Sequence, residues 1–248
     1  MRINTILTPL MVEELYFAGR IAVVIDVLRA TSTITTAIMN GAKEIVPVGS
    51  LDFSKIASAS SFGGRTMRGG EKNSKKIEGF DLGNSPLEYV ESVVKGKSIV
   101  FFTTNGSKAI VKTKYGSGTF ICSFLNVSKV AEVLVNLGKE YDIVCSGRNG
   151  DFSLEDTVCA GMLISELLKL NSDLTLSDAS KVALDLYEKY GSDLRSLFGV
   201  SEHGKILENE GFIEDLQYCS QTNITDIVPV FENSSIKLYN SAQHLTNN

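Results

Sequence analysis

Short apolar runs alternate with amphipathic stretches along most of the chain. Residues Ile21–Ile25 form a continuous apolar run rich in β-branched side chains, which is typical of a strand buried on both faces of a parallel sheet. The stretch 31–40 then predicts a helix, with Gly41 as its C-terminal cap. Further strands are predicted at 44–48, 98–102, 119–123, 142–145 and 224–231, and further helices at 86–95, 128–137, 154–170, 178–190 and 201–218, the last interrupted near Gly211. This alternation predicts the α/β class, with a three-layer α/β/α arrangement around a mostly parallel or mixed sheet.

The pattern predicts a single domain over residues 1–248. No fixed-period repeat and no linker is visible in the sequence, and a division into two subdomains near 125–140 is left open. The longest irregular segment, 61–85, contains six glycines. It is too long for a simple connection, so we expect a functional loop there.

Composition narrows the class of function. The 24 basic and 29 acidic residues give a net charge of −5, which argues against a protein that binds nucleic acid by neutralising phosphates. Apolar runs are far shorter than the ~20 residues of a membrane span, and the first ten residues lack a signal-peptide pattern. We therefore expect a cytoplasmic protein with neither a nucleic-acid nor a membrane partner; homo-oligomer formation is left open. The four cysteines form no Cys-x-x-Cys pair, and two histidines cannot build a His-rich metal site.

Polar residues follow three of the predicted strands, and each polar segment leads into a predicted helix. These segments are 26–33, 103–107 and 146–153. Ligands of open α/β sheets bind outside the carboxyl ends of strands, where helix N-termini present unpaired N–H groups. The residues suited to hold an anion there are Arg29, Thr31, Ser32, Thr33, Thr104, Asn105, Gly106, Arg148 and Asn149. The set predicts a small, multiply anionic ligand.

Carboxylates are predicted at the same edge of the sheet. Asp26 ends a strand, Asp156 lies in the first turn of a helix, and Glu71 lies in the glycine-rich segment. Acids beside anion donors suit Mg²⁺, which takes one or two carboxylates plus substrate oxygens and water. Both aspartates also allow a purely structural interpretation. Asp26 could do no more than cap a turn, and Asp156 could do no more than stabilise the N-terminus of its helix. These residues predict an enzyme of metal-assisted phosphoryl transfer to water.

Four motifs occur in order along the chain: Asp26-Val-Leu-Arg-Ala-Thr-Ser-Thr-Ile34, Gly79-Phe-Asp-Leu-Gly-Asn-Ser-Pro86, Thr103-Thr-Asn-Gly106 and Phe152-Ser-Leu-Glu-Asp156. Together they resemble the 2-phosphosulfolactate phosphatase family over residues 20–230. The resemblance implies a magnesium-dependent phosphoric monoester hydrolase that converts 2-phospho-3-sulfolactate to 3-sulfolactate and inorganic phosphate, a step toward coenzyme M.

The resemblance and the strand ends together assign roles. Asp26, Arg29, Asn105 and Asp156 are the predicted catalytic residues, and Asp26, Glu71 and Asp156 the predicted Mg²⁺ ligands. The predicted substrate-binding residues are Thr31, Ser32, Thr33, Thr104, Gly106, Arg148 and Asn149. The chain departs from the family pattern at Lys72, where the family has arginine, and at Asn223, where it has aspartate. Two other functions remain open: a phosphatase of other 2-hydroxy-acid phosphates, and a non-catalytic protein that binds phosphate esters.

Overall fold

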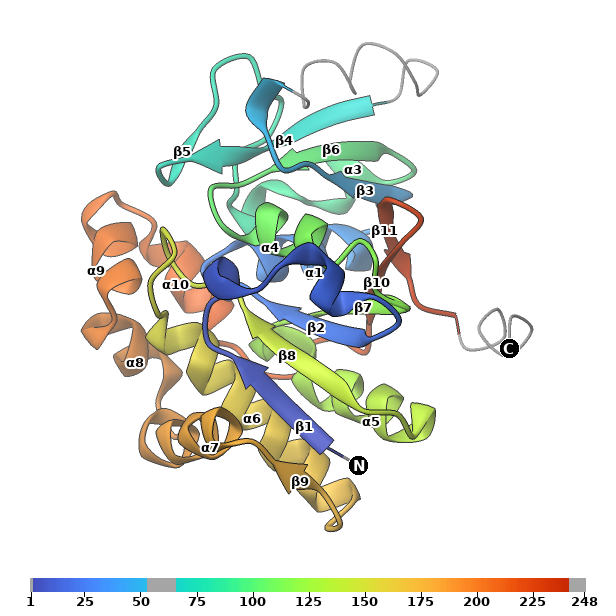
Figure 1. Ribbon diagram of the computed structural model, residues 1–248. Coiled ribbons are helices and arrows are strands. Elements are labelled where there is room, and N and C mark those ends of the chain that lie inside the picture. The colour runs from blue at the N-terminus through green and yellow to red at the C-terminus, as the bar shows by residue number, and fades with distance from the viewer. Residues whose placement is uncertain (1, 53–65, 241–248) are drawn as a thin grey trace.

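A mixed sheet of eleven strands runs through the computed structural model, which describes residues 2–52 and 66–240 (Figure 1). The strands lie in the order β5-β4-β6-β3-β11-β10-β7-β2-β8-β1-β9. Their bounds are β1 Arg2–Ile6, β2 Ile21–Ile25, β3 Glu44–Pro47, β4 Thr66–Lys72, β5 Lys75–Lys76, β6 Ser98–Phe102, β7 Gly118–Cys122, β8 Tyr141–Cys145, β9 Thr175–Leu176, β10 Pro229–Glu232 and β11 Ser235–Leu238. The predicted α/β class and mixed sheet are confirmed.

Helices follow most of the parallel strands. Their bounds are α1 Ala30–Met39, α3 Glu91–Val94, α4 Gly106–Lys112, α5 Val127–Leu137, α6 Leu154–Leu170, α7 Asp178–Tyr190, α8 Leu194–Val200, α9 Glu202–Asn209 and α10 Ile213–Cys219, with 3-10 turns at η1 Pro9–Met11, η2 Glu14–Phe17, η3 Pro86–Glu88 and η4 Phe124–Asn126. No helix in the described ranges has both the length and the apolar character to cross a membrane.

The sheet consists of two parallel groups of strands joined by an antiparallel hairpin. One group is β4-β6-β3, the other is β7-β2-β8-β1, and the hairpin β10–β11 pairs with β7 on one side and β3 on the other. Three antiparallel pairings separate the groups, so along the sheet their strands run in opposite senses. Right-handed twist accumulates to roughly 100–125° over the five steps from β6 to β2. This rotation offsets much of the reversal and brings the carboxyl ends of β6, β2 and β8 to one place.

Two apolar cores lie on opposite faces of β2, as its period-2 alternation requires. Val23 and Ile25 pack with α5, α6 and α7, whereas Ala22 and Val24 pack with α1 and α4. The second core also takes buried side chains from β3 and β6, so α1 and α4 lie between the two parallel groups (Figure 1).

Several predicted elements differ from the structure. The helix predicted at 86–95 is interrupted, because Val90 between η3 and α3 has extended backbone. The predicted strand 224–231 forms only at β10, and the segment 61–85 contains the hairpin β4–β5; residues 61–65 lie outside the described residues. The predicted break near Gly211 is confirmed, with Gly211 at φ +87 between α9 and α10. Strands β1, β9 and β11 and helix α8 were not predicted.

Candidate active site

Two adjoining cavities lie where the carboxyl ends of β2, β6 and β8 meet. The inner cavity has a volume of about 10 Å³, and the outer cavity about 260 Å³. Both are lined by Glu71, Ser74, Asn105 and His203, which places them side by side. The inner one is also lined by Asp26, Leu28, Arg29, Asn84 and Thr103, and the outer one by Asn73, Thr104, Arg148, Asn149 and Ile206.

Asp26 and Asp156 form a buried acid pair bridged by Ser146. The Ser146 hydroxyl oxygen lies 2.9 Å from Asp26 Oδ2 and 3.1 Å from Asp156 Oδ2. The other oxygen of each carboxyl accepts a backbone N–H, from Ala30 for Asp26 and from Val27 for Asp156. The structure thus joins the end of β2 to the start of α6 through the loop after β8.

Burial controls the charge of this pair. It raises the pKa of Asp26 from 3.8 to about 6, and the nearby carboxylates of Glu71 and Glu155 add to the increase. Burial, together with the charge of Asp26, holds the pKa of Asp156 well above its usual range. One hydroxyl proton cannot serve two carboxylates at once, so the cluster favours either a bound proton or a nearby cation.

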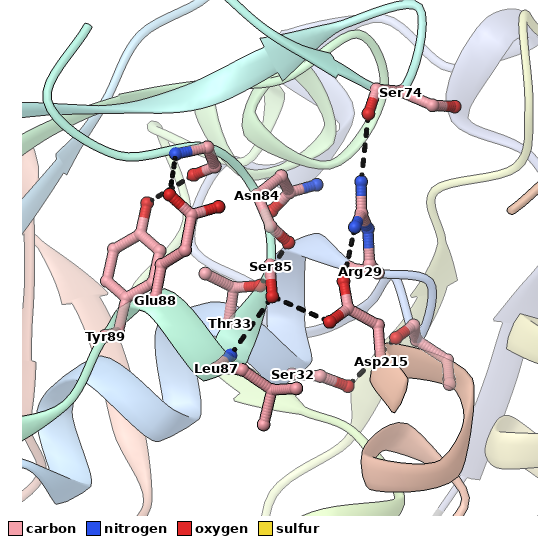
Figure 2. A network of polar contacts seen from close by, with 12 residues as sticks. Arg29, Ser32, Thr33, Ser74, Asn84, Ser85, Leu87, Glu88, Tyr89 and Asp215 are labelled. Atoms are coloured by element: carbon pink, nitrogen blue, oxygen red, sulfur yellow. Dashed lines mark hydrogen bonds and ion pairs between the residues drawn. The ribbon is translucent and has the colours of Figure 1, made fainter. Parts of the chain in front are cut away.

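Arg29 is buried against the acid side of the inner cavity, at 2% exposure (Figure 2). Its guanidinium forms an ion pair with Asp215 of α10, donates to the carbonyl of Ser74 at 3.0 Å, and lies 3.9 Å from the centre of the Phe212 ring. Asp215 also accepts from the Ser85 hydroxyl at 2.7 Å. Three contacts from two separate segments therefore fix the orientation of Arg29, and Ser85 in turn holds Asp215.

The loop after β6 brings Thr104 and Asn105 to the site, and Gly106 allows it to come close. The Asn105 side-chain oxygen accepts from the backbone N–H of Asn149 at 2.9 Å, which ties this loop to the one after β8. A Cβ atom at Gly106 would lie 2.5 Å from Asp26 Oδ2. Only glycine lets α4 begin this close to Asp26.

The outer cavity is lined by one arginine, Arg148, and by one carboxylate, Glu71, among otherwise uncharged groups. Arg148 is about one-third exposed, with its guanidinium 3.8 Å from the carboxylate of Glu202. His203 of α9 lies on both cavities, and burial lowers its pKa to about 4, with further lowering from Arg148 and Arg29. The imidazole is therefore neutral at pH 7.

The structure places three predicted substrate-binding hydroxyls away from the cavities. Thr31 donates to the carbonyl of Asp26, Ser32 to that of Val27, and Thr33 to that of Asn84, and all three side chains are fully buried. Thr31 and Ser32 thereby stabilise the turn that carries Asp26 and Arg29, and Thr33 fastens the segment of Asn84 to α1. Their predicted contact with substrate has no support in this arrangement.

The sequence matches a known protein family over most of its length. The family model described as 2-phosphosulpholactate phosphatase matches residues 6–234. The chain belongs to this family. The predicted membership is confirmed, and since the family is one of phosphoric monoester hydrolases, the prediction of an enzyme is confirmed with it.

Three relatives illustrate the extent of the similarity, each carrying the name probable 2-phosphosulfolactate phosphatase. The protein of Clostridium perfringens strain SM101 is 42% identical over 97% of this chain and 98% of its own length. The protein of Caldanaerobacter subterraneus subsp. tengcongensis is 44% identical over 87% of this chain and 89% of its own length. The protein of Symbiobacterium thermophilum is 40% identical over 91% of this chain and 96% of its own length. The similarity thus extends over nearly the whole of each chain.

The three predicted Mg²⁺ ligands do not share one coordination shell. Within residues 2–52 and 66–240, no three His, Cys, Asp or Glu side chains are grouped closely enough to hold a metal ion. Glu71 accepts instead from the backbone N–H groups of Thr104 and Ser74, each at 2.7 Å, and thereby anchors the β4–β5 hairpin. Asp26 and Asp156 remain, and two carboxylates are enough for Mg²⁺ when substrate and water supply the other oxygens. The donor chemistry of this pair fits the ion.

Four residues at the site were not among the predicted ones. Ser146 follows β8 within a segment that the polar pattern had marked, Asn84 lies in the Gly79–Pro86 motif, and His203 lies in the first turn of α9 and lines both cavities. The fourth, Asp215, lies 186 residues from Arg29, its ion-pair partner. No local pattern in the sequence links those two positions.

Proposed function

We propose that the protein hydrolyses 2-phospho-3-sulfolactate to 3-sulfolactate and inorganic phosphate with the help of Mg²⁺. The observation that carries the proposal is the Asp26–Asp156 pair, of which Asp26 lines the inner cavity together with Arg29, while the adjoining outer cavity is lined by Arg148. Membership in the family and the names of the relatives support the choice of substrate. In this proposal the enzyme works in the cytoplasm and its product enters the route to coenzyme M.

The residues divide the work between charge neutralisation and positioning. Arg29, buried and oriented by Asp215, binds the phosphoryl group beside Asp26. Arg148 and Asn149 contact the carboxylate or sulfonate in the outer cavity. Asp26 and Asp156 would hold Mg²⁺, which when bound neutralises phosphoryl charge and makes a bound water more acidic.

The remaining groups keep the phosphoryl ester in place for attack by water. The Asn105–Asn149 hydrogen bond holds two loops together between the cavities. Cleavage of the P–O bond leaves the electron pair on the 2-oxygen of sulfolactate, which takes up a proton given up by the attacking water, and the oxygen of that water becomes part of orthophosphate. Neutral His203 adds no positive charge to the cavity at pH 7, so the two arginines supply the cationic groups among the lining residues.

Phosphate release measured on three substrates tests the proposal. We expect faster turnover of 2-phospho-3-sulfolactate than of phospholactate or phosphoglycolate, loss of turnover with a chelator, and a decrease of about 10²-fold or more in Asp26→Asn. Asp178→Asn, an exposed change on α7, is the matched control and should retain full activity. Equal turnover of the three esters would favour a broader 2-hydroxy-acid phosphatase. Binding of the ester without release under any metal would contradict an enzymatic function.

A further inference from the structure

The side-chain oxygen of Asn84 is buried at the candidate active site without a hydrogen-bonding partner. The exposed fraction of Asn84 is 6%, and its Oδ1 atom has no partner among the residues that the structure describes. The backbone carbonyl of Asn84 accepts from Thr33 at 2.8 Å, so the loop is held by the main chain. The fold therefore does not use this side-chain oxygen, although a polar atom buried without a partner destabilises a protein.

The carboxamide faces the inner cavity. Asn84 lines that cavity together with Arg29 and Asp26, and Figure 2 shows its side chain pointing toward the Arg29 guanidinium. A volume of about 10 Å³ holds about one oxygen-sized atom. An anion oxygen in this space would lie between the amide and the guanidinium, and the rest of the molecule would extend into the outer cavity.

We propose that Asn84 is a substrate-binding residue whose NH₂ group donates a hydrogen bond to a phosphoryl oxygen beside Arg29. This inference rests on the proposed function and adds a residue to it. The phosphoryl group, and not the carboxylate or sulfonate, is the partner because Asp26, the candidate catalytic acid, lines the same small cavity. The other two anionic groups then face Arg148 in the outer cavity.

Binding of orthophosphate, measured by titration calorimetry with Mg²⁺ present, tests this role without relying on turnover. Asn84→Ala should weaken orthophosphate binding about 10- to 100-fold, the usual effect of losing a hydrogen bond to a charged group. Asn84→Asp should weaken it further, since a carboxylate would repel the anion. Inhibition by 3-sulfolactate, which has no phosphoryl group, should change less than about threefold in Asn84→Ala.

Thermal unfolding separates binding from folding. The melting temperature of free Asn84→Ala should equal or exceed that of the wild type, because no internal hydrogen bond is lost. Asn40→Ala is the matched control: the Asn40 amide donates to the carbonyl of Tyr89 at 2.8 Å, so this variant should melt lower and still bind orthophosphate.

Three results would overturn the role of Asn84: wild-type protein that binds no orthophosphate, unchanged orthophosphate affinity in Asn84→Ala, or an equal loss of affinity for 3-sulfolactate. The proposed function fails separately. If the wild type binds orthophosphate through Asn84 but releases none from 2-phospho-3-sulfolactate, the substrate is wrong and the binding residue stands.

Discussion

The buried ion pair between Arg29 and Asp215 predicts a large and specific loss of stability. Their side chains are 2% and 4% exposed, so Asp215→Asn leaves a cation inside the protein without its counter-charge. Removing one member of such a pair destabilises by about 3–5 kcal/mol. Arg29 retains the carbonyl of Ser74 and the ring of Phe212. We therefore expect the lower end, about 3 kcal/mol, out of a typical total of roughly 5–15 kcal/mol.

Urea unfolding of a double-mutant cycle measures this effect. Arg29→Met and Asp215→Leu should each be strongly destabilising. The double variant should be more stable than the sum of the single changes predicts, because it leaves no unpaired charge in the interior. As a control, Glu91→Gln removes the partner of Lys95 in an ion pair exposed on both sides, and it should change the free energy of unfolding far less than Asp215→Asn.

A free energy of unfolding for Asp215→Asn within about 1 kcal/mol of the wild-type value would refute this prediction. Strictly additive effects in the cycle would refute it as well, because residues in direct contact that share one buried charge pair should couple. The outcome bears on function, since Arg29 is oriented by Asp215 at the inner cavity.

Three further predictions follow from the site. Gly106→Ala must push α4 about 1 Å away from Asp26 and should reduce turnover about 10²-fold, measured by phosphate release. Gly199→Ala, where an added Cβ meets no described atom within 4 Å, should retain wild-type turnover. The pKa of His203 is lowered from 6.5 to about 4 in the folded protein. The stability contributed by the neutral imidazole is therefore present above pH 6.5 and is lost as the pH falls toward 4. Between pH 7 and 5, the free energy of unfolding in urea should fall by about 2 kcal/mol more for the wild type than for His203→Gln. Glu71→Gln should loosen the β4–β5 hairpin, visible as faster hydrogen exchange there, and unchanged exchange would show that the carboxylate does not anchor it.

The sequence predicted those parts of the site that lie directly after strands. Asp26, Asn105 and Asn149 each follow an apolar run, and the structure brings them together around adjoining cavities. The same pattern could not tell a hydroxyl that binds substrate from one that holds a turn. Thr31 illustrates this, since its hydroxyl donates to the carbonyl of Asp26 within the loop itself.

The remaining elements could not be predicted because they form by pairing with strands far away in the sequence. The segment that contains Glu71 was predicted as a loop because glycine and charged residues have low strand propensity. It nevertheless forms the strand β4 by pairing with β6. Strand β1 escaped prediction because it is short and mixed in polarity, and its pairing partner β8 lies more than 130 residues further along the chain. Such elements depend on tertiary contacts more than on local propensity.

The position of the β10–β11 hairpin has a consequence for biosynthesis. It covers the edges of β3 and β7, yet it consists of residues 229–238, which are synthesised after both of these strands. Until the ribosome has released this segment, both edges present unpaired backbone groups that can pair with other chains. Nascent or truncated protein ending before residue 229 should therefore expose both edges and aggregate unless chaperones protect it.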